Sequence, residues 1–212
     1  MKHMLITAAA MAWALAGAVS VSTARAAERP NILFIIVDDL GWRDFSCYGS
    51  KFYETPNIDR LAAQGVRFTE AYVAYPRCVP SRFAFMTGKY PARVQGSTEG
   101  MRLGLREVSL GQALKDGGYT NFFCGKWHLG DGANAPDHQG FDLNIAGGEA
   151  GATRSHFAPY TVSRHGSEGT EAPILGLDDA PKGEYLADRL TTETIGFIRS
   201  RTNQPFFAVL AH

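Results

Sequence analysis

Ile32-Leu33-Phe34-Ile35-Ile36-Val37 is the stretch that indicates the fold, and Asp38-Asp39 follows it directly. A continuous apolar run rich in β-branched residues is typical of a central strand that is buried on both faces of a sheet. In open α/β sheets, ligands collect beyond the carboxyl ends of the strands, so paired acids there are well placed to hold a metal. The alternative interpretation is that Asp38 and Asp39 simply open a turn.

Helical and extended patterns alternate after this strand. Thr55 and Pro56 predict the cap and the first position of a helix that ends at Gly65. Residues 66–69 follow as a short predicted strand.

Three more elements are expected in the second half of the chain. Ser109 with Gln112 predicts a capping box at the start of a helix, and residues 119–124 follow as a strand. Residues 183–199 predict an amphipathic helix, and residues 205–212 predict another buried strand. The inward face of that helix is expected to carry Leu186, Leu190, Ile195 and Ile198. The alternation favours an α/β fold with a parallel-rich sheet covered on both sides.

A second informative stretch is Cys78-Val79-Pro80-Ser81-Arg82, which predicts the start of a helix that ends at Gly88. Pro80 suits the first turn, because its missing N–H would be unsatisfied there anyway. Cys78 would then lie at the positive end of the helix dipole, with Arg82 about one turn further on. That arrangement can bind an anion and activate a nucleophile. The alternative is a buried cysteine with a packing role.

A third stretch, Gly125-Lys126-Trp127-His128-Leu129-Gly130, follows the strand predicted at 119–124. Lys126 and His128 are two residues apart, so in an extended segment both would face the same side and could meet one anion. The alternative is a solvent-facing lysine and a packing histidine.

Composition excludes several classes of function. The chain has 212 residues, with 21 Lys plus Arg and 21 Asp plus Glu, so its net charge is zero. A neutral chain has no basic field that would favour nucleic acid or an anionic membrane surface. Hydrophobic residues make up 45% of the sequence, which is ordinary for a globular protein.

Residues 1–26 are interpreted as a signal peptide. Lys2 gives a positive start, residues 4–19 are uncharged and apolar, and Ala24-Arg25-Ala26 fits a cleavage site. The alternative is an uncleaved membrane anchor, since the apolar stretch is nearly long enough to span a bilayer. We expect an exported protein, periplasmic or secreted, with no stable membrane insertion.

Export makes disulfides possible, but the chain has only Cys47, Cys78 and Cys124. Cys47 and Cys124 could pair or remain thiols, which leaves Cys78 as the natural unpaired one. His138, His156 and His165 lie where substrate loops are expected, and no spacing argument gives them more than a surface role.

The three stretches together resemble the formylglycine-dependent sulfatases of the alkaline phosphatase superfamily. The quoted matches are Cys78-Val79-Pro80-Ser81-Arg82 with Thr87-Gly88, the run from Asn31 through Asp38-Asp39 to Gly41, and Gly125 to Gly130. The resemblance implies an alkaline-phosphatase-like three-layer α/β/α sandwich with a mostly parallel central sheet. It also implies hydrolysis of sulfate esters, with an aryl compound or a carbohydrate as the alcohol.

The resemblance also implies roles for individual residues. A maturation enzyme would oxidise Cys78 to formylglycine, whose hydrated aldehyde attacks sulfur. Asp38, Asp39 and the modified Cys78 would ligate one divalent cation, calcium. Arg82 would steady the nucleophile, Lys126 would contact the sulfate, and His128 would take the proton that lets the sulfated intermediate release sulfate.

The resemblance covers nearly all of residues 27–212 but only the N-terminal portion of the family. It therefore implies a catalytic domain truncated at its C-terminal end, without a later His and Lys and without the remaining metal ligands. His212 receives no catalytic role on this basis. Two other interpretations stay open: a phosphonate or phosphodiester hydrolase of the same superfamily, and a non-catalytic fragment such as a carbohydrate-binding relic.

Overall fold

The computed structural model describes residues 29–94, 101–163 and 170–212. The predicted signal peptide at residues 1–26 lies outside these ranges, as does His165. Within them, no helix is long enough and apolar enough to cross a membrane.

Four parallel strands form the central sheet of the described residues, in the order β1-β6-β2-β3. These strands are β1 (Ile32–Ile36), β2 (Thr120–Gly125), β3 (Leu143–Ile145) and β6 (Phe206–Ala211). The register places Val209 of β6 beside Phe34 on one side and Phe123 on the other. A separate antiparallel pair is formed by β4 (Thr161–Ser163) and β5 (Glu171–Pro173). The predicted parallel α/β sheet is therefore confirmed.

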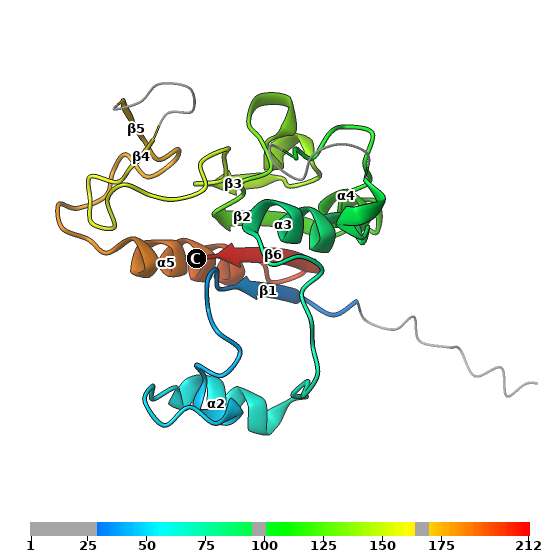
Figure 1. Cartoon of the computed structure of the whole chain (residues 1–212). Helices are drawn as coiled ribbons and strands as arrows, with labels where there is room; N and C mark the ends of the chain where they lie inside the picture. The colour runs from blue at the N-terminus through cyan, green and yellow to red at the C-terminus, as the bar shows by residue number, and fades with distance from the viewer. Residues whose placement is uncertain (1–28, 95–100, 164–169) are drawn as a thin grey trace, which may run out of the picture.

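Helices cover both faces of this sheet (Figure 1). On one face lies α5 (Leu186–Ser200), and on the other lie α3 (Cys78–Thr87) and α4 (Leu110–Asp116). Because side chains alternate along a strand, β6 contributes side chains to the hydrophobic core on each face of the sheet. Phe206, Ala208 and Leu210 pack toward α5, whereas Phe207, Val209 and Ala211 pack toward α3 and α4. The result is the three-layer arrangement that the sequence predicted.

The position of β1 corrects one expectation. This strand was predicted to be central and buried on both faces, yet it pairs only with β6 among the described strands. Phe34 packs into the core beside α3, whereas the side chains on the opposite face, Leu33 and Ile35, are 45% and 49% exposed. The apolar run correctly predicted a strand. It could not reveal that α5 packs on β2 and β6 and leaves this face of β1 uncovered.

Helix α3 confirms its sequence signals. It begins at Cys78 and ends before Gly88, which takes a left-handed conformation with φ 68°. At the start of α4, half of the predicted capping box forms. The Ser109 side chain accepts a hydrogen bond from the Gln112 N–H, whereas the Gln112 side chain donates to Asp116.

Three other local predictions are wrong. Thr55 makes no capping hydrogen bond to α2 (Pro56–Gln64), because its hydroxyl is engaged by Ser46 and Asp59 instead. Residues 66–69 form no strand, since no neighbouring segment pairs with them. Ile195 of α5 is 41% exposed, and the buried positions at that level are Thr194 and Phe197.

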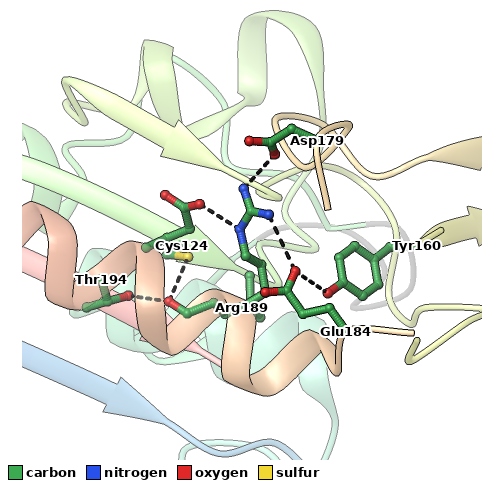
Figure 2. Close-up of polar contacts among 8 residues, drawn as sticks. Cys124, Tyr160, Asp179, Glu184, Arg189 and Thr194 are labelled. Carbon is green, nitrogen blue, oxygen red and sulfur yellow. Dashed lines mark hydrogen bonds and ion pairs between the residues drawn. The ribbon is translucent and has the colours of Figure 1, made fainter. Parts of the chain in front are cut away.

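Arg189 fastens the segment before α5 to that helix (Figure 2). Its guanidinium binds Asp179 at 2.6 Å, Glu184 at 3.4 Å and Glu193 at 2.7 Å. Glu184 also accepts a hydrogen bond from the Tyr160 hydroxyl at 3.1 Å. Because these partners lie on both sides of the start of α5, the network sets where the chain enters this helix.

Gly125, at the end of β2, lies close to the backbone of β6. Its φ is 104°, and a Cβ atom there would lie 1.9 Å from the carbonyl oxygen of Ala211. Only glycine lets β2 approach β6 this closely, and this approach sets the position of Lys126. Lys126 then donates its own N–H to the same carbonyl at 2.9 Å.

The substitution Gly125→Ala should therefore destabilise the protein. The left-handed backbone and the clash together should cost about 2–5 kcal/mol. The matched control is Gly88→Ala, which has a similar left-handed φ but no atom within 4 Å of its Cβ position. It should cost only about 1–2 kcal/mol. The check is the free energy of unfolding from urea titrations. Equal losses for the two variants would contradict the close-contact argument.

Candidate active site

Three predicted site residues, together with His212, follow strands that end at one edge of the sheet. Asp38 and Asp39 follow β1, Lys126 follows β2, and His212 follows β6. Since β6 lies between β1 and β2 and all three run parallel, their carboxyl ends meet. The backbone ladder continues past the strands, because the His212 N–H donates to the Ile36 carbonyl at 3.0 Å.

Asp38 is the anionic centre of this edge. Its Oδ2 accepts hydrogen bonds from Lys126 Nζ and from Arg82 Nη2, the latter at 3.3 Å. Partial burial by itself would raise the pKa of the carboxyl group. The hydrogen bond from Lys126 and the charges of Arg82 and Lys126 outweigh burial, so the pKa of Asp38 lies below its ordinary value. Asp38 is therefore a carboxylate at neutral pH.

Arg82 connects α3 to this edge of the sheet. Its side chain is 3% exposed, and besides the Asp38 contact its Nη1 donates to the Lys126 carbonyl oxygen. Burial lowers the pKa of Arg82, while the nearby charges of Asp38, Cys78 and Asp39 act in the opposite direction. Among the described residues, its buried Nε–H has no hydrogen-bond partner. The guanidinium therefore lies near both acids and Cys78.

Cys78 is the first residue of α3 and is half-buried. Arg82 lies one turn further along the same helix, as the sequence spacing predicted. The helix N-terminus adds partial positive charge and unpaired N–H groups at Cys78. The thiol thus faces an electropositive setting made by the helix end and the guanidinium.

The other two cysteines are not bonded to each other. Both are free thiols in the structure. Cys124 lies in the core beside α5, where its thiol contacts the Leu190 carbonyl at 3.5 Å (Figure 2). Burial raises the pKa of Cys124 to about 12, so this thiol is unreactive at neutral pH.

A cavity of about 330 Å³ opens at the strand ends. Asp38, Asp39, Lys126 and His212 form its polar end. Most of the remaining wall is apolar and comes from the segment between β3 and β4 and from the start of α5. The apolar residues of this wall include Ala146, Val162, Ile174, Leu186 and Leu190. A charged group and an apolar group of one ligand could therefore be held side by side.

His128 lines a second, larger cavity of about 680 Å³. This cavity adjoins the first, and residues 146 and 150–152 line both. Lys126 and His128 were expected to face one side, but they line different cavities. The chain leaves the extended conformation at His128, whose φ is 58°, so the alternation of an extended segment does not hold there.

Left-handed backbone marks this region. Among the described non-glycine residues, φ is positive at Asp39, His128 and Ala146, with values of 56°, 58° and 63°. All three line one of the two cavities. Such conformations are costly for side chains other than glycine and often occur at functional sites.

Sequence analysis missed part of the cavity wall. Tyr185, which it did not single out, lines the cavity that holds Lys126, and so does His156, which it placed only in an expected substrate loop. His212 does the same, and burial lowers the pKa of its imidazole below the ordinary value. Its position directly after the central strand β6 was the only signal available.

The two acids offer the kind of ligand that calcium prefers. Hard cations take oxygen ligands, and Asp38 is held as a carboxylate beside Asp39. Within the described ranges, no group of three or more His, Cys, Asp and Glu side chains is arranged to hold a metal ion. Asp38 and Asp39 therefore fit calcium as part of a larger ligand set.

Comparison with known proteins agrees with this arrangement. The sulfatase family model matches residues 30–212. Human steryl-sulfatase is 44% identical over 136 residues, which cover 55% of this chain and 23% of the human protein. The N-acetylgalactosamine-6-O-sulfatase of Bacteroides thetaiotaomicron is 46% identical over 112 residues, which cover 50% of this chain and 22% of that protein.

A solved structure in complex with its substrate D-glucosamine-2-N,6-O-disulfate is similar in three dimensions. It superposes with a TM-score of 0.67 at 26% identity, over 87% of this chain and 34% of that chain. The present chain spans about a quarter of the length of the two curated relatives. Because the family model matches nearly all of the described residues, the chain belongs to the sulfatase family of the alkaline phosphatase superfamily.

Proposed function

We propose that this protein hydrolyses sulfate esters with a nucleophile made from Cys78 and a calcium ion. One observation carries the proposal: the buried Arg82, which places the N-terminus of α3, Asp38 and Lys126 around one point. Two cationic side chains and a helix N-terminus are suited to stabilise negative charge on a transferring sulfuryl group.

Each proposed role follows from the chemistry of the residue. Asp38 and Asp39 would hold the calcium ion together with the modified Cys78. Formylglycine made from Cys78 would supply a hydroxyl nucleophile when hydrated, and calcium would supply positive charge beside it. Arg82 keeps the nucleophile in place and adds positive charge beside it. Lys126 binds a sulfate oxygen, a contact for which Asp38 competes in the present arrangement.

His128 is proposed to accept a proton during release of sulfate. An imidazole is suited to this step because its ordinary pKa lies close to neutral pH. The cavity that it lines adjoins the one that holds Lys126, so both residues can reach one ligand that spans the two cavities.

The alcohol part of the substrate is proposed to be an aryl compound or a carbohydrate. One curated relative is named for a steryl sulfate and the other for a sulfated N-acetylgalactosamine. The apolar wall beside Lys126 suits the first type, and the larger cavity beside His128 has room for the second. We also propose that a maturation enzyme oxidises Cys78 and that the protein has an extracytoplasmic location.

The direct test uses the protein produced with a formylglycine-generating enzyme. Hydrazide trapping and peptide mass should find an aldehyde at position 78, and the protein should release an aryl alcohol from its sulfate. The substitution Cys78→Ala should abolish both signals. Parallel assays with a phosphate diester and a phosphonate ester test the rival activity. Higher kcat/KM on either of these, or an unmodified thiol beside an active maturation enzyme, would overturn the proposal.

The substitution His128→Ala should lower kcat by about 10²- to 10⁴-fold, because a positioned proton acceptor is lost. His138→Ala is the matched control, since it removes another imidazole from the same cavity. Its kcat should stay close to that of the unsubstituted protein. Steady-state kinetics with an aryl sulfate give both values. An unchanged rate for His128→Ala would return this residue to a packing role.

The substitution Asp39→Asn should weaken calcium binding by at least about 10-fold and lower activity, because a hard cation loses a charged ligand. Asp39 is a cleaner choice than Asp38, which also forms ion pairs with Arg82 and Lys126. Calcium titration calorimetry gives the affinity, and thermal unfolding shows whether the fold persists. Asp178→Asn, at an exposed acid outside both cavities, should change neither. Full activity of the protein after chelation of calcium would contradict the metal assignment.

A further inference from the structure

His128 is enclosed by the glycine-rich segment between β3 and β4. Its backbone N–H donates to the Gly148 carbonyl at 2.9 Å, and its left-handed φ of 58° directs the chain under this segment. The conformation of the segment therefore determines where the imidazole lies.

Asn144 keeps the segment in one conformation. Its side-chain oxygen accepts the Gly147 N–H, and its side-chain nitrogen donates to the Gly147 carbonyl, both at 3.0 Å. A Cβ at Gly147 would meet Asn144 at 2.3 Å and Pro136 at 2.8 Å, so the backbone here is closely packed. The segment is thus a fixed surface rather than a free loop.

Gly151 is where this surface meets the imidazole. A Cβ at this position would lie 2.4 Å from Cε1, 2.6 Å from Nε2 and 2.9 Å from Nδ1 of His128. These three atoms are its nearest contacts, and all belong to one ring. Because residue 151 has no side chain, the imidazole of His128 can occupy this space.

We propose that Gly151 is a positioning residue for His128: the absence of a side chain at 151 sets the place of the imidazole. The inference rests on the proposed proton-transfer role of His128. A methyl group at 151 would require the ring to retreat by roughly 1 Å to regain an ordinary contact distance. The ring can do so by side-chain rotation, so the fold need not change.

Such a displacement is enough to impair proton transfer. The acceptor must lie within about 2.6–3.2 Å of the proton that it takes, and a misplacement of about 1 Å can cost up to about 100-fold in rate. The side chains of Arg82 and Lys126, which would bind the anion, are held by Asp38 and by the Lys126 carbonyl and not by residue 151. Gly151→Ala should therefore lower kcat about 10- to 100-fold while KM for an aryl sulfate stays nearly constant.

Gly104→Ala provides the control. A Cβ there has no atom within 4 Å, its φ is not left-handed, and the residue lines neither cavity. This variant should keep both kcat and KM. The two variants thus compare the same change, glycine to alanine, with and without contact to the imidazole.

The experiment measures kcat and KM of the matured full-length protein and of its Gly151→Ala, Gly104→Ala and His128→Ala variants. Thermal midpoints and crystal structures of the two alanine-for-glycine variants are determined in parallel. The expected result is a displaced imidazole and a lowered kcat in Gly151→Ala alone, with similar thermal midpoints for both. Equal kcat for the two variants, or an imidazole that has not moved in Gly151→Ala, would overturn the inference.

Failure of the proposed function would look different. In that case His128→Ala itself would retain full activity, and the catalytic part of the inference would fall with it. The crystal structure of Gly151→Ala would still decide whether residue 151 sets the position of the ring.

Discussion

The site depends on one buried charge, the guanidinium of Arg82. A buried arginine is tolerated only when its charge and its donors are matched, because removing them from water is costly. Here the Asp38 carboxylate supplies the charge and the Lys126 carbonyl supplies an acceptor. Both come from the ends of strands, so satisfying Arg82 pulls the N-terminus of α3 against the sheet. Cys78, four residues before Arg82 on the same helix, is brought toward this edge of the sheet with it.

The parallel sheet supplies the second constraint. Since β6 lies between β1 and β2, the segments that follow these strands emerge side by side. The close approach at Gly125 brings Lys126 onto the carbonyl of Ala211. The chain must turn sharply beyond the strands, and Asp39 and His128 do so in left-handed conformations. Packing of the surrounding segments, such as the one held by Asn144, maintains this strained backbone.

Local signals in the sequence predicted helix boundaries correctly where contacts between residues close in the sequence determine them. The bounds of α3 follow from Pro80 near its start and Gly88 after its end, and the cap of α4 follows from Ser109. The cap expected from Thr55 failed because a more distant residue, Ser46, competes for the same hydroxyl. The strand expected at 66–69 failed because a strand needs a partner, which a local pattern cannot supply.

The sequence by itself determined which residues are available for chemistry, and at what spacing along each element. It placed Cys78 and Arg82 one turn apart on a helix, and it placed two acids and a lysine directly after strands. Only the tertiary structure decided which of these residues meet. Strand order brought Asp38 and Lys126 into contact, and left-handed turns sent Lys126 and His128 to different cavities. The order of strands, the uncovered face of β1 and the contact between Gly151 and the imidazole all depend on segments far apart in the chain. Periodicity and spacing describe neighbours along the chain, so they carry no information on such contacts.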